Sequence, residues 1–289
     1  MKRSLSMNTQ EEIKTQFQFN CFGKLYAYLS SSLIRWGGTK GERLVRQVIV
    51  QYAQEKGAHI RQHQEEKGIS INLKNLFLEE PCCGADPRFY RVNLRDTRQS
   101  QLQEVYSCPL EKQWRALNEM FAGSLYCEEY AHALIKGYTL GRGQANVSNS
   151  LTCSRDNRCV QAFYYRTANM TPQQQWELEN GTEASPERNT GRNILCLYHA
   201  FYENIKDQGV DGIAALACGL RAFAKDIICA VSDEASRTGR AVDETFMDEF
   251  LPVPYNHKIL DNTTSFLEDT EKKIFEINIV EQIQATFAL

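Results

Sequence analysis

The segment from Tyr106 to Arg166 constrains this chain most, because it gathers side chains that bind metals or act as nucleophiles. It holds four of the ten cysteines of the sequence: Cys108, Cys127, Cys153 and Cys159. The stretches on either side resemble each other, and this segment has no second copy. A site built from these four thiols would therefore occur once in the chain.

Residues 20–117 and 192–289 follow the same order of predicted elements, two helices and then two strands. Glycines fall at matching places in the two stretches, Gly41 with Gly212 and Gly68 with Gly239. Self-similarity of this kind indicates a duplicated unit, and we interpret the stretches as two copies. The alternative is two amphipathic helix pairs that resemble each other only in composition.

Hydrophobic periodicity predicts long helices and short strands. Apolar side chains recur at helical spacing over residues 22–33, 44–53 and 213–227, whereas residues 89–94, 102–108, 145–153 and 159–167 are typical of strands. The last two strands, joined by residues 154–158, predict an antiparallel hairpin. We therefore expect an α+β fold in which antiparallel strands pack against long helices.

These elements suggest a division of the chain into a tail and two domains. We expect a disordered tail over residues 1–18, because no periodicity appears before Phe19. A cysteine-containing domain would follow over residues 19–180. Residues 192–289 would form a second, truncated copy of the helix and strand unit, packed on the first.

Charge and hydropathy exclude several classes of protein. The net charge of -3 is not that of a nucleic-acid-binding protein, which usually carries a basic face. No window approaches the ~20 apolar residues of a membrane helix, and the N-terminus lacks the apolar core of a signal peptide. We expect a cytoplasmic protein with reduced thiols and a small molecule as its partner. A monomer is expected, because an internal duplication can replace a dimer of single copies.

Cys153 and Cys159 stand symmetrically about Asp156 in the predicted hairpin. Opposite positions on paired strands place Cβ atoms about 5 Å apart, which suits a shared metal ion, a redox pair, or simply two half-buried thiols. Cys127 from a helix and Cys108 at a strand end would complete a metal site. Zinc is the ion that such a thiolate set would hold.

Cys127, Glu128 and His132 lie close together on one predicted helix. Glu128 and His132 are four residues apart and face the same way, which suits either proton transfer or an ion pair on the helix surface. The aromatic residues Trp114, Tyr126 and Tyr130 would either line a substrate pocket or pack in the core.

These residues together resemble a known family. The resemblance rests on Cys108-Pro109-Leu110, Trp114, Leu125-Tyr126-Cys127-Glu128, Gly137-Tyr138, the span from Cys153 to Cys159, and Phe163. In this pattern the chain resembles the L-2-amino-thiazoline-4-carboxylic acid hydrolase family over about residues 20–166. More distantly, Cys127 with Cys153 and Cys159 resembles the vinyl-reductase-type small-molecule-binding domains, some of which hold a structural zinc ion.

The resemblance implies two competing functions. The first is hydrolytic opening of a small cyclic C–N/C–S substrate such as an aminothiazoline carboxylate, by a thiolate or a metal-bound water. Cys127 would be the nucleophile or a ligand, and Glu128 and His132 would handle protons. The second is a non-catalytic, vinyl-reductase-like binding protein in which zinc on Cys127, Cys153 and Cys159 stabilises the fold.

Overall fold

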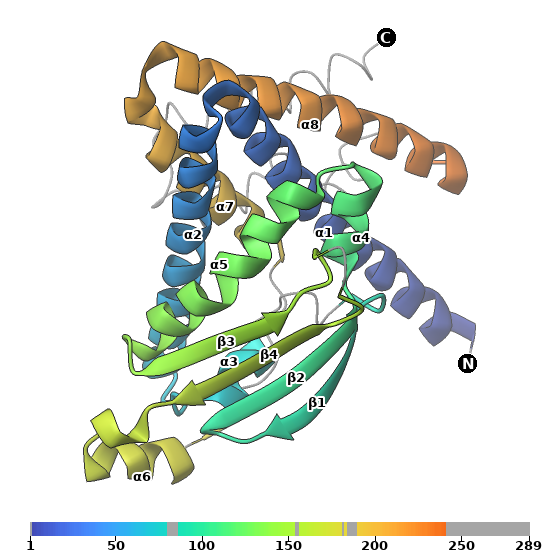
Figure 1. Cartoon of the computed structure of the whole chain (residues 1–289). Coiled ribbons are helices and arrows are strands. Elements are labelled where there is room, and N and C mark those ends of the chain that lie inside the picture. The colour runs from blue at the N-terminus through green and yellow to red at the C-terminus, as the bar shows by residue number, and fades with distance from the viewer. Residues whose placement is uncertain (1, 80–85, 154–155, 181, 184–189, 241–289) are drawn as a thin grey trace. The chain divides into compact units, whose positions relative to one another are not determined.

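The computed structural model describes residues 2–79, 86–153, 156–180, 182–183 and 190–240 (Figure 1). The chain divides into two compact units, one formed by Met1–Val45 with Thr190–Leu289 and the other by Arg46–Asn189. Helix α2 (Thr39–Glu66) contains the boundary between them. This division differs from the expected domains 19–180 and 192–289, because the N-terminal helix is grouped with the C-terminal residues.

The unit Arg46–Asn189 is built on a four-stranded antiparallel sheet with the order β1-β2-β4-β3 (Figure 1). Its strands are β1 (Tyr90–Asp96), β2 (Ser100–Ser107), β3 (Gly143–Asn149) and β4 (Cys159–Tyr165). Helices α2, α3 (Leu73–Glu79), α4 (Pro109–Ala116), α5 (Met120–Thr139) and α6 (Pro172–Asn180) complete the unit, with a short 3-10 turn at Thr167–Asn169. The predicted α+β class, with antiparallel strands packed against helices, is confirmed.

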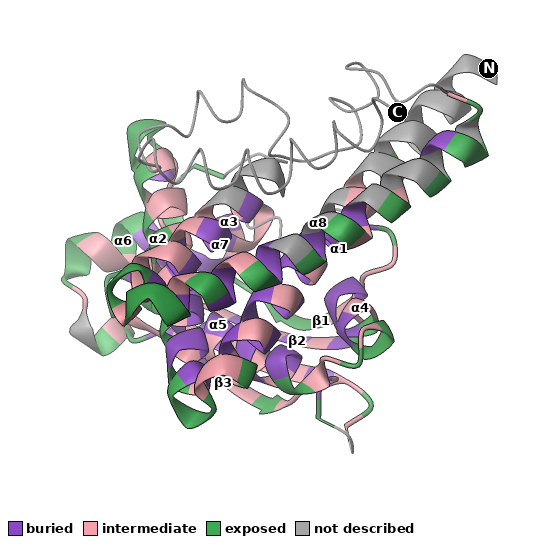
Figure 2. Cartoon of the chain, turned by 90° about the horizontal axis from the view of Figure 1, so that it is seen from above, coloured by how far each residue is buried: buried purple, intermediate pink, exposed green. Residues whose placement is uncertain are grey.

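One face of the sheet is covered, since α5 crosses it and α3 packs against β2 and β4. Alternation along a strand sends every second side chain to that face, and in β4 these are Cys159, Gln161, Phe163 and Tyr165. The core of the unit joins them to α3 and α5: Leu73, Leu76, Ala131, Ile135, Tyr138, Ala145, Phe163, Tyr165 and Leu178. In Figure 2 buried residues follow α5, whereas the outer strand β1 is mostly exposed.

Pro109 begins α4 at the position where its missing N–H is tolerated. Gly123 lies inside α5, near the start of the helix. A Cβ atom at Gly123 would lie 2.4 Å from Cε3 of Trp114. The glycine therefore allows α5 to approach the indole ring closely, and does not end the helix.

The connection between β3 and β4 is longer than predicted, because β3 ends at Asn149. The carboxylate of Asp156 accepts hydrogen bonds from Nδ2 of Asn149 at 3.0 Å and from the backbone N–H of Ser150 at 2.9 Å. Such local side-chain bonds compete with strand pairing. As a result Cys153 lies in the connection, and Asn149 rather than Cys153 is paired near the start of β4.

The other unit contains the helices α1 (Lys2–Gly37), α7 (Thr190–Ile205) and α8 (Gly209–Thr238), with a 3-10 turn at Lys206–Gln208. Helix α1 packs along α8 and α7, and its first turns include residues expected to form a disordered tail. The carboxylate of Asp226 on α8 accepts hydrogen bonds from Lys24 Nζ at 2.7 Å and from the Tyr28 hydroxyl at 2.8 Å. These two bonds tie α1 to α8.

The predicted duplication lies partly outside the described residues. Helices α2 and α8 are each followed within two residues by a glycine in the left-handed region, Gly68 with φ +65° and Gly239 with φ +64°. The strands of the second copy would fall within residues 241–289, outside the described residues. The duplication therefore stays a prediction. Among the described helices, none is both long and apolar enough to cross a membrane.

Candidate functional site

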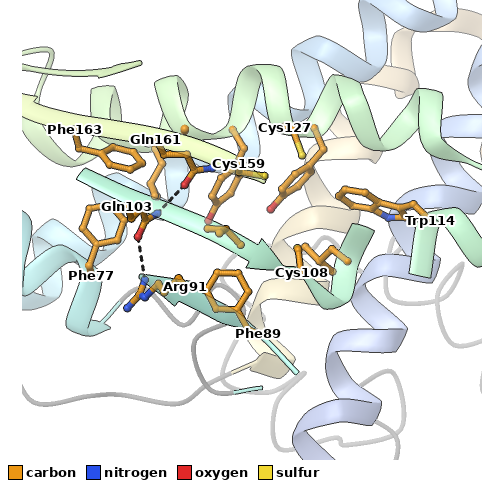
Figure 3. A pocket seen from close by; sticks show the side chains of 16 residues that line it. Phe77, Phe89, Arg91, Gln103, Cys108, Trp114, Cys127, Cys159, Gln161 and Phe163 are labelled. Carbon is orange, nitrogen blue, oxygen red and sulfur yellow. Dashed lines mark hydrogen bonds between the residues drawn. The ribbon is translucent and has the colours of Figure 1, made fainter. Parts of the chain in front are cut away.

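A cavity of about 100 Å³ lies between the covered face of the sheet and helices α3, α4 and α5, entirely within the unit Arg46–Asn189 (Figure 3). Most of its wall is apolar. The lining residues are Phe77, Phe89, Arg91, Gln103, Val105, Cys108, Leu110, Trp114, Tyr126, Cys127, Tyr130, Ala131, Leu134, Cys159, Gln161 and Phe163.

Three thiols meet at one end of this cavity, and each comes from a different element. Cys108 precedes α4, Cys127 lies on α5, and Cys159 begins β4. Burial raises the pKa of the Cys127 thiol to about 12, and the neighbouring thiols of Cys108 and Cys159 add to the rise. The Cys127 thiol is therefore protonated at neutral pH.

The connection between β3 and β4 supplies polar partners to the same thiols. The hydroxyls of Thr152 and Ser150 hydrogen-bond with the Cys127 thiol and act to lower its pKa. The backbone N–H of Leu151 donates to Sγ of Cys159 at 3.2 Å. Burial still dominates and raises the pKa of Cys159 as well. A hydrogen bond to an ionised acceptor is stronger than one to a neutral acceptor, so these donors favour the thiolate over the thiol.

Away from the thiols, the polar side chains of Arg91, Gln103 and Gln161 lie beside Phe77 and Phe163 (Figure 3). Gln103 and Gln161 lie opposite each other in the β2–β4 register, and Nε2 of Gln103 donates to Oε1 of Gln161 at 2.7 Å. Arg91 on β1 donates a longer bond of 3.4 Å from its guanidinium to Oε1 of Gln103. Arg91 is the charged side chain among the described residues that line the cavity.

Aromatic side chains from α4 and α5 form another part of the wall. Tyr126 and Tyr130, one helical turn apart on α5, stack with ring centroids 4.8 Å apart, and Trp114 on α4 lies 5.4 Å from Tyr126. Lys56 Nζ on α2 donates to the Tyr130 hydroxyl at 2.9 Å. The three aromatic residues that were predicted to bind substrate thus lie in the wall of the cavity.

Glu128 and His132 do not reach the cavity, since both are exposed on α5. The Glu128 carboxylate accepts a hydrogen bond of 2.7 Å from Arg46 on α2, which also binds Glu129 at 2.8 Å. The structure therefore places Glu128 in a surface ion pair with Arg46, and it does not bring Glu128 or His132 together with the Cys127 thiol.

Cys153 also lies apart from the other thiols, because it is exposed in the β3–β4 connection. The predicted meeting of Cys127 with Cys159 is found, but Cys108 rather than Cys153 is the third member of the cluster. Across the described part of the chain, no group of three or more His, Cys, Asp or Glu side chains is arranged to hold a metal ion. The predicted four-cysteine zinc set does not fit this geometry.

Sequence reasoning missed Arg91, Gln103 and Gln161. Apolar residues of a strand usually face the core, and glutamines usually face solvent. This rule places Leu102 on the covered face of β2 and Gln103 on the other, which is the reverse of the structure. The signal in the sequence is the spacing of Gln101, Gln103 and Val105 at every second position, which places them on one face of the strand. In the structure all three are buried.

The cavity thus combines one guanidinium group, an aromatic wall and three cysteine thiols. The chain matches the family of L-2-amino-thiazoline-4-carboxylic acid hydrolases over residues 14–145. The resemblance to this hydrolase family is thereby confirmed for that range, which includes Arg91, Trp114 and Cys127 of the cavity. No curated protein and no solved structure matches the chain. The hydrolase match ends before β4, which supplies Cys159 and Gln161.

Proposed function

We propose that this chain hydrolyses a small cyclic amidine-type substrate that carries a carboxylate, as 2-amino-thiazoline-4-carboxylate does. The observation that supports the proposal is the position of Arg91 and Cys127 at opposite ends of one small, apolar cavity. The match to the hydrolase family independently supports the same substrate class.

Binding would orient the ring between these two groups. The guanidinium of Arg91 holds the carboxylate, because a charge-assisted hydrogen bond is stronger than a neutral one, and the hydrogen-bonded pair Gln103–Gln161 fixes the adjacent polar wall. The flat ring lies along Trp114 and Tyr126. This orientation directs the amidine carbon toward the Cys127 thiol, at the sulfur end of the cavity.

The raised pKa of Cys127 suits this substrate. The thiol keeps its proton until the substrate binds, and a basic ring nitrogen of the amidine then accepts it. The thiolate formed in this way attacks the amidine carbon, while the hydroxyls of Ser150 and Thr152 stabilise the charge on sulfur. No separate general base is required in the cavity wall, because the substrate itself takes the proton.

Ring opening and hydrolysis complete the cycle. The bond between the amidine carbon and the ring sulfur breaks, and the departing sulfur takes up the transferred proton as a free thiol. Water then adds to the carbon attached to Cys127, the carbon–sulfur bond to Cys127 breaks, and the Cys127 thiol is restored. One water is consumed, and the product is a carbamoylated amino thiol acid.

The test is turnover of 2-amino-thiazoline-4-carboxylate by the reduced full-length protein, measured by release of free thiol. The carboxamide analogue, which has the same ring without the charge, is the matched control substrate. The proposal expects turnover of the carboxylate and at least about tenfold lower kcat/KM for the carboxamide, because Arg91 would lose a charged partner. A protein that consumes neither compound would contradict the proposal.

A second function, ligand binding without catalysis, is favoured by one observation. The described residues that line the cavity include no His, Asp, Glu or Lys, so a general acid or base would have to come from the ligand. This alternative expects saturable binding of the carboxylate, seen by calorimetry, with no chemical change in the recovered compound. Recovery of ring-opened product after binding would contradict it.

A further inference from the structure

A second and larger cleft, of about 400 Å³, lies at the other end of β4 within the unit Arg46–Asn189. Strand β4 begins at Cys159 beside the first cavity and ends at Tyr165 beside this one. We call it the α6 cleft, because α6 forms one wall through Gln174, Trp176, Glu177 and Leu178, opposite the end of α2.

The walls of the α6 cleft are fixed by several hydrogen bonds. The backbone carbonyl of Thr182 accepts bonds from the Ser70 N–H at 3.2 Å and from Nδ2 of Asn75 at 2.9 Å. Gln99 on the sheet side donates from Nε2 to the carboxylate of Glu179 on α6 at 2.6 Å. The cleft therefore has a defined shape and is not a gap beside a loosely attached helix.

Two guanidinium groups border the cleft. Arg61 is held in place, because it pairs with Glu65 at 2.6 Å and donates to the Tyr138 carbonyl at 3.2 Å. Arg142, in the turn before β3, makes no side-chain hydrogen bond or ion pair with any described residue. Both cations lie near the Tyr165 hydroxyl, since each acts to lower the pKa of that group against the raising effect of burial.

The two carboxylates of the cleft do not neutralise Arg142. Glu65 is paired with Arg61, and Glu177 is exposed on α6, where it accepts a hydrogen bond from Gln173 at 2.8 Å. A cation without a partner beside a defined cavity is the arrangement that binds anionic groups.

The remaining walls favour a flat apolar body. Ile71, Met170 and Trp176 line the cleft, and Trp176 is 61% exposed, so its indole ring is accessible to a ligand. The Tyr165 hydroxyl is buried and has no hydrogen-bond partner among the described residues. A ligand carboxylate bound to Arg142 would be close enough to accept a hydrogen bond from this hydroxyl.

We propose that the α6 cleft is a second ligand site, which binds a small carboxylate with a flat apolar body through Arg142 and Arg61. The site is independent of the proposed hydrolysis, since none of its lining residues lines the cavity of the three thiols. The carboxylate lies against the two guanidinium groups, and the ring of the ligand covers Trp176.

The test uses 4-fluorobenzoate as the probe, 4-fluorobenzamide as its neutral control, and the full-length protein. Binding is followed by ¹⁹F NMR of the probe and by the indole N–H resonance of Trp176. The proposal expects saturable binding of the benzoate with a shift of the Trp176 resonance, and at least about tenfold weaker binding of the benzamide.

Variants separate the α6 cleft from the first cavity. Arg142→Gln is expected to weaken benzoate binding at least about tenfold, whereas Arg95→Gln, on the exposed strand β1, and Arg91→Gln should leave the Trp176 shift unchanged. Equal affinity of the Arg142→Gln variant, a benzamide that binds as well as the benzoate, loss of binding only in Arg91→Gln, or no binding at all would each overturn the proposal.

Discussion

Gln103 on β2 and Gln161 on β4 lie opposite each other and share a hydrogen bond of 2.7 Å on the covered face of the sheet. Two amides in a position that strands normally give to apolar residues place a polar surface at one end of an otherwise apolar cavity. Arg91 reaches the same pair from β1. The cavity is therefore asymmetric, with the guanidinium of Arg91 on one side and the thiol of Cys127 on the other.

The first prediction concerns Arg91. The substitution Arg91→Met removes the charge that would hold the substrate carboxylate. We therefore expect KM for 2-amino-thiazoline-4-carboxylate to rise about tenfold to a hundredfold, while kcat changes little. Steady-state kinetics checks this. Arg95→Met, on the exposed part of the same strand, is the matched control and should behave like the unmodified protein. A fall in kcat at constant KM would assign Arg91 to the chemical step instead.

The second prediction concerns thiol reactivity. Because burial raises the pKa of Cys127 from 9.0 to about 12, its thiolate fraction at pH 8 is lower than that of an unperturbed thiol by about a thousandfold. In iodoacetamide labelling followed by peptide mass spectrometry, exposed Cys153 should be modified well before Cys127. Labelling of Cys127 should still be accelerating above pH 10. Rapid labelling of Cys127 at neutral pH would show that its thiol is not buried as described.

The third prediction concerns the connection that carries Ser150 and Thr152. Hydrogen bonds, first from the Ser150 N–H and then from Asn149, lower the pKa of Asp156 below its ordinary value. Ionised Asp156 therefore stabilises the fold above the pKa of the unfolded chain, and this contribution is lost as the pH falls through the lower folded pKa. We expect Asp156→Asn to lower Tm at pH 7, with the difference from the unmodified protein shrinking below about pH 4.

Thermal unfolding across this pH range checks the prediction. Asp96→Asn, at the exposed end of β1, is the control for removal of one carboxylate charge and should have a smaller effect at pH 7. If the Tm of Asp156→Asn differed from that of the unmodified protein by the same amount at every pH, the carboxylate charge would not be what holds the connection.

The fourth prediction concerns the aromatic wall. Gly123→Ala would place Cβ 2.4 Å from the Trp114 ring, so α5 and the indole must separate. We expect a loss of about 1–3 kcal/mol in the free energy of unfolding, as for other overpacked cores, measured by denaturant titration. Gly37→Ala, whose Cβ would meet nothing closer than 3.8 Å, is the control. An equal effect of the two substitutions would contradict the close packing of Gly123 on Trp114.

Much of the fold follows from local sequence patterns. Helical spacing of apolar residues predicts parts of α1, α2 and α8, and the strand-like patterns predict the four strands. The end of β3 was misplaced, because the bonds from Asn149 and Ser150 to Asp156 stop the strand. Such a competition between side-chain and ladder hydrogen bonds is not visible in a propensity pattern.

The candidate site was only partly predictable. Trp114, Tyr126, Tyr130 and Cys127 were found from their types and spacing, and the family match covers them. Cys153 was included with Cys108 in the predicted set because its symmetry with Cys159 about Asp156 suggested a facing pair, whereas the structure leaves it exposed. For Glu128 the sequence left a surface ion pair as one alternative, but its partner, Arg46, comes from a helix distant in sequence. Contacts between distant elements depend on packing, which spacing on one helix does not determine.

The proposed hydrolysis depends most on Cys127 as the thiol that attacks the substrate. The direct measurement is kcat/KM for 2-amino-thiazoline-4-carboxylate with Cys127→Ser and with Cys153→Ser, each shown to fold by its thermal transition. We predict a loss of at least about a thousandfold for Cys127→Ser, the scale seen when a nucleophile is removed, and near-normal turnover for Cys153→Ser, which changes an exposed thiol. A folded Cys127→Ser protein that turns over at the normal rate would contradict the proposed role of this thiol.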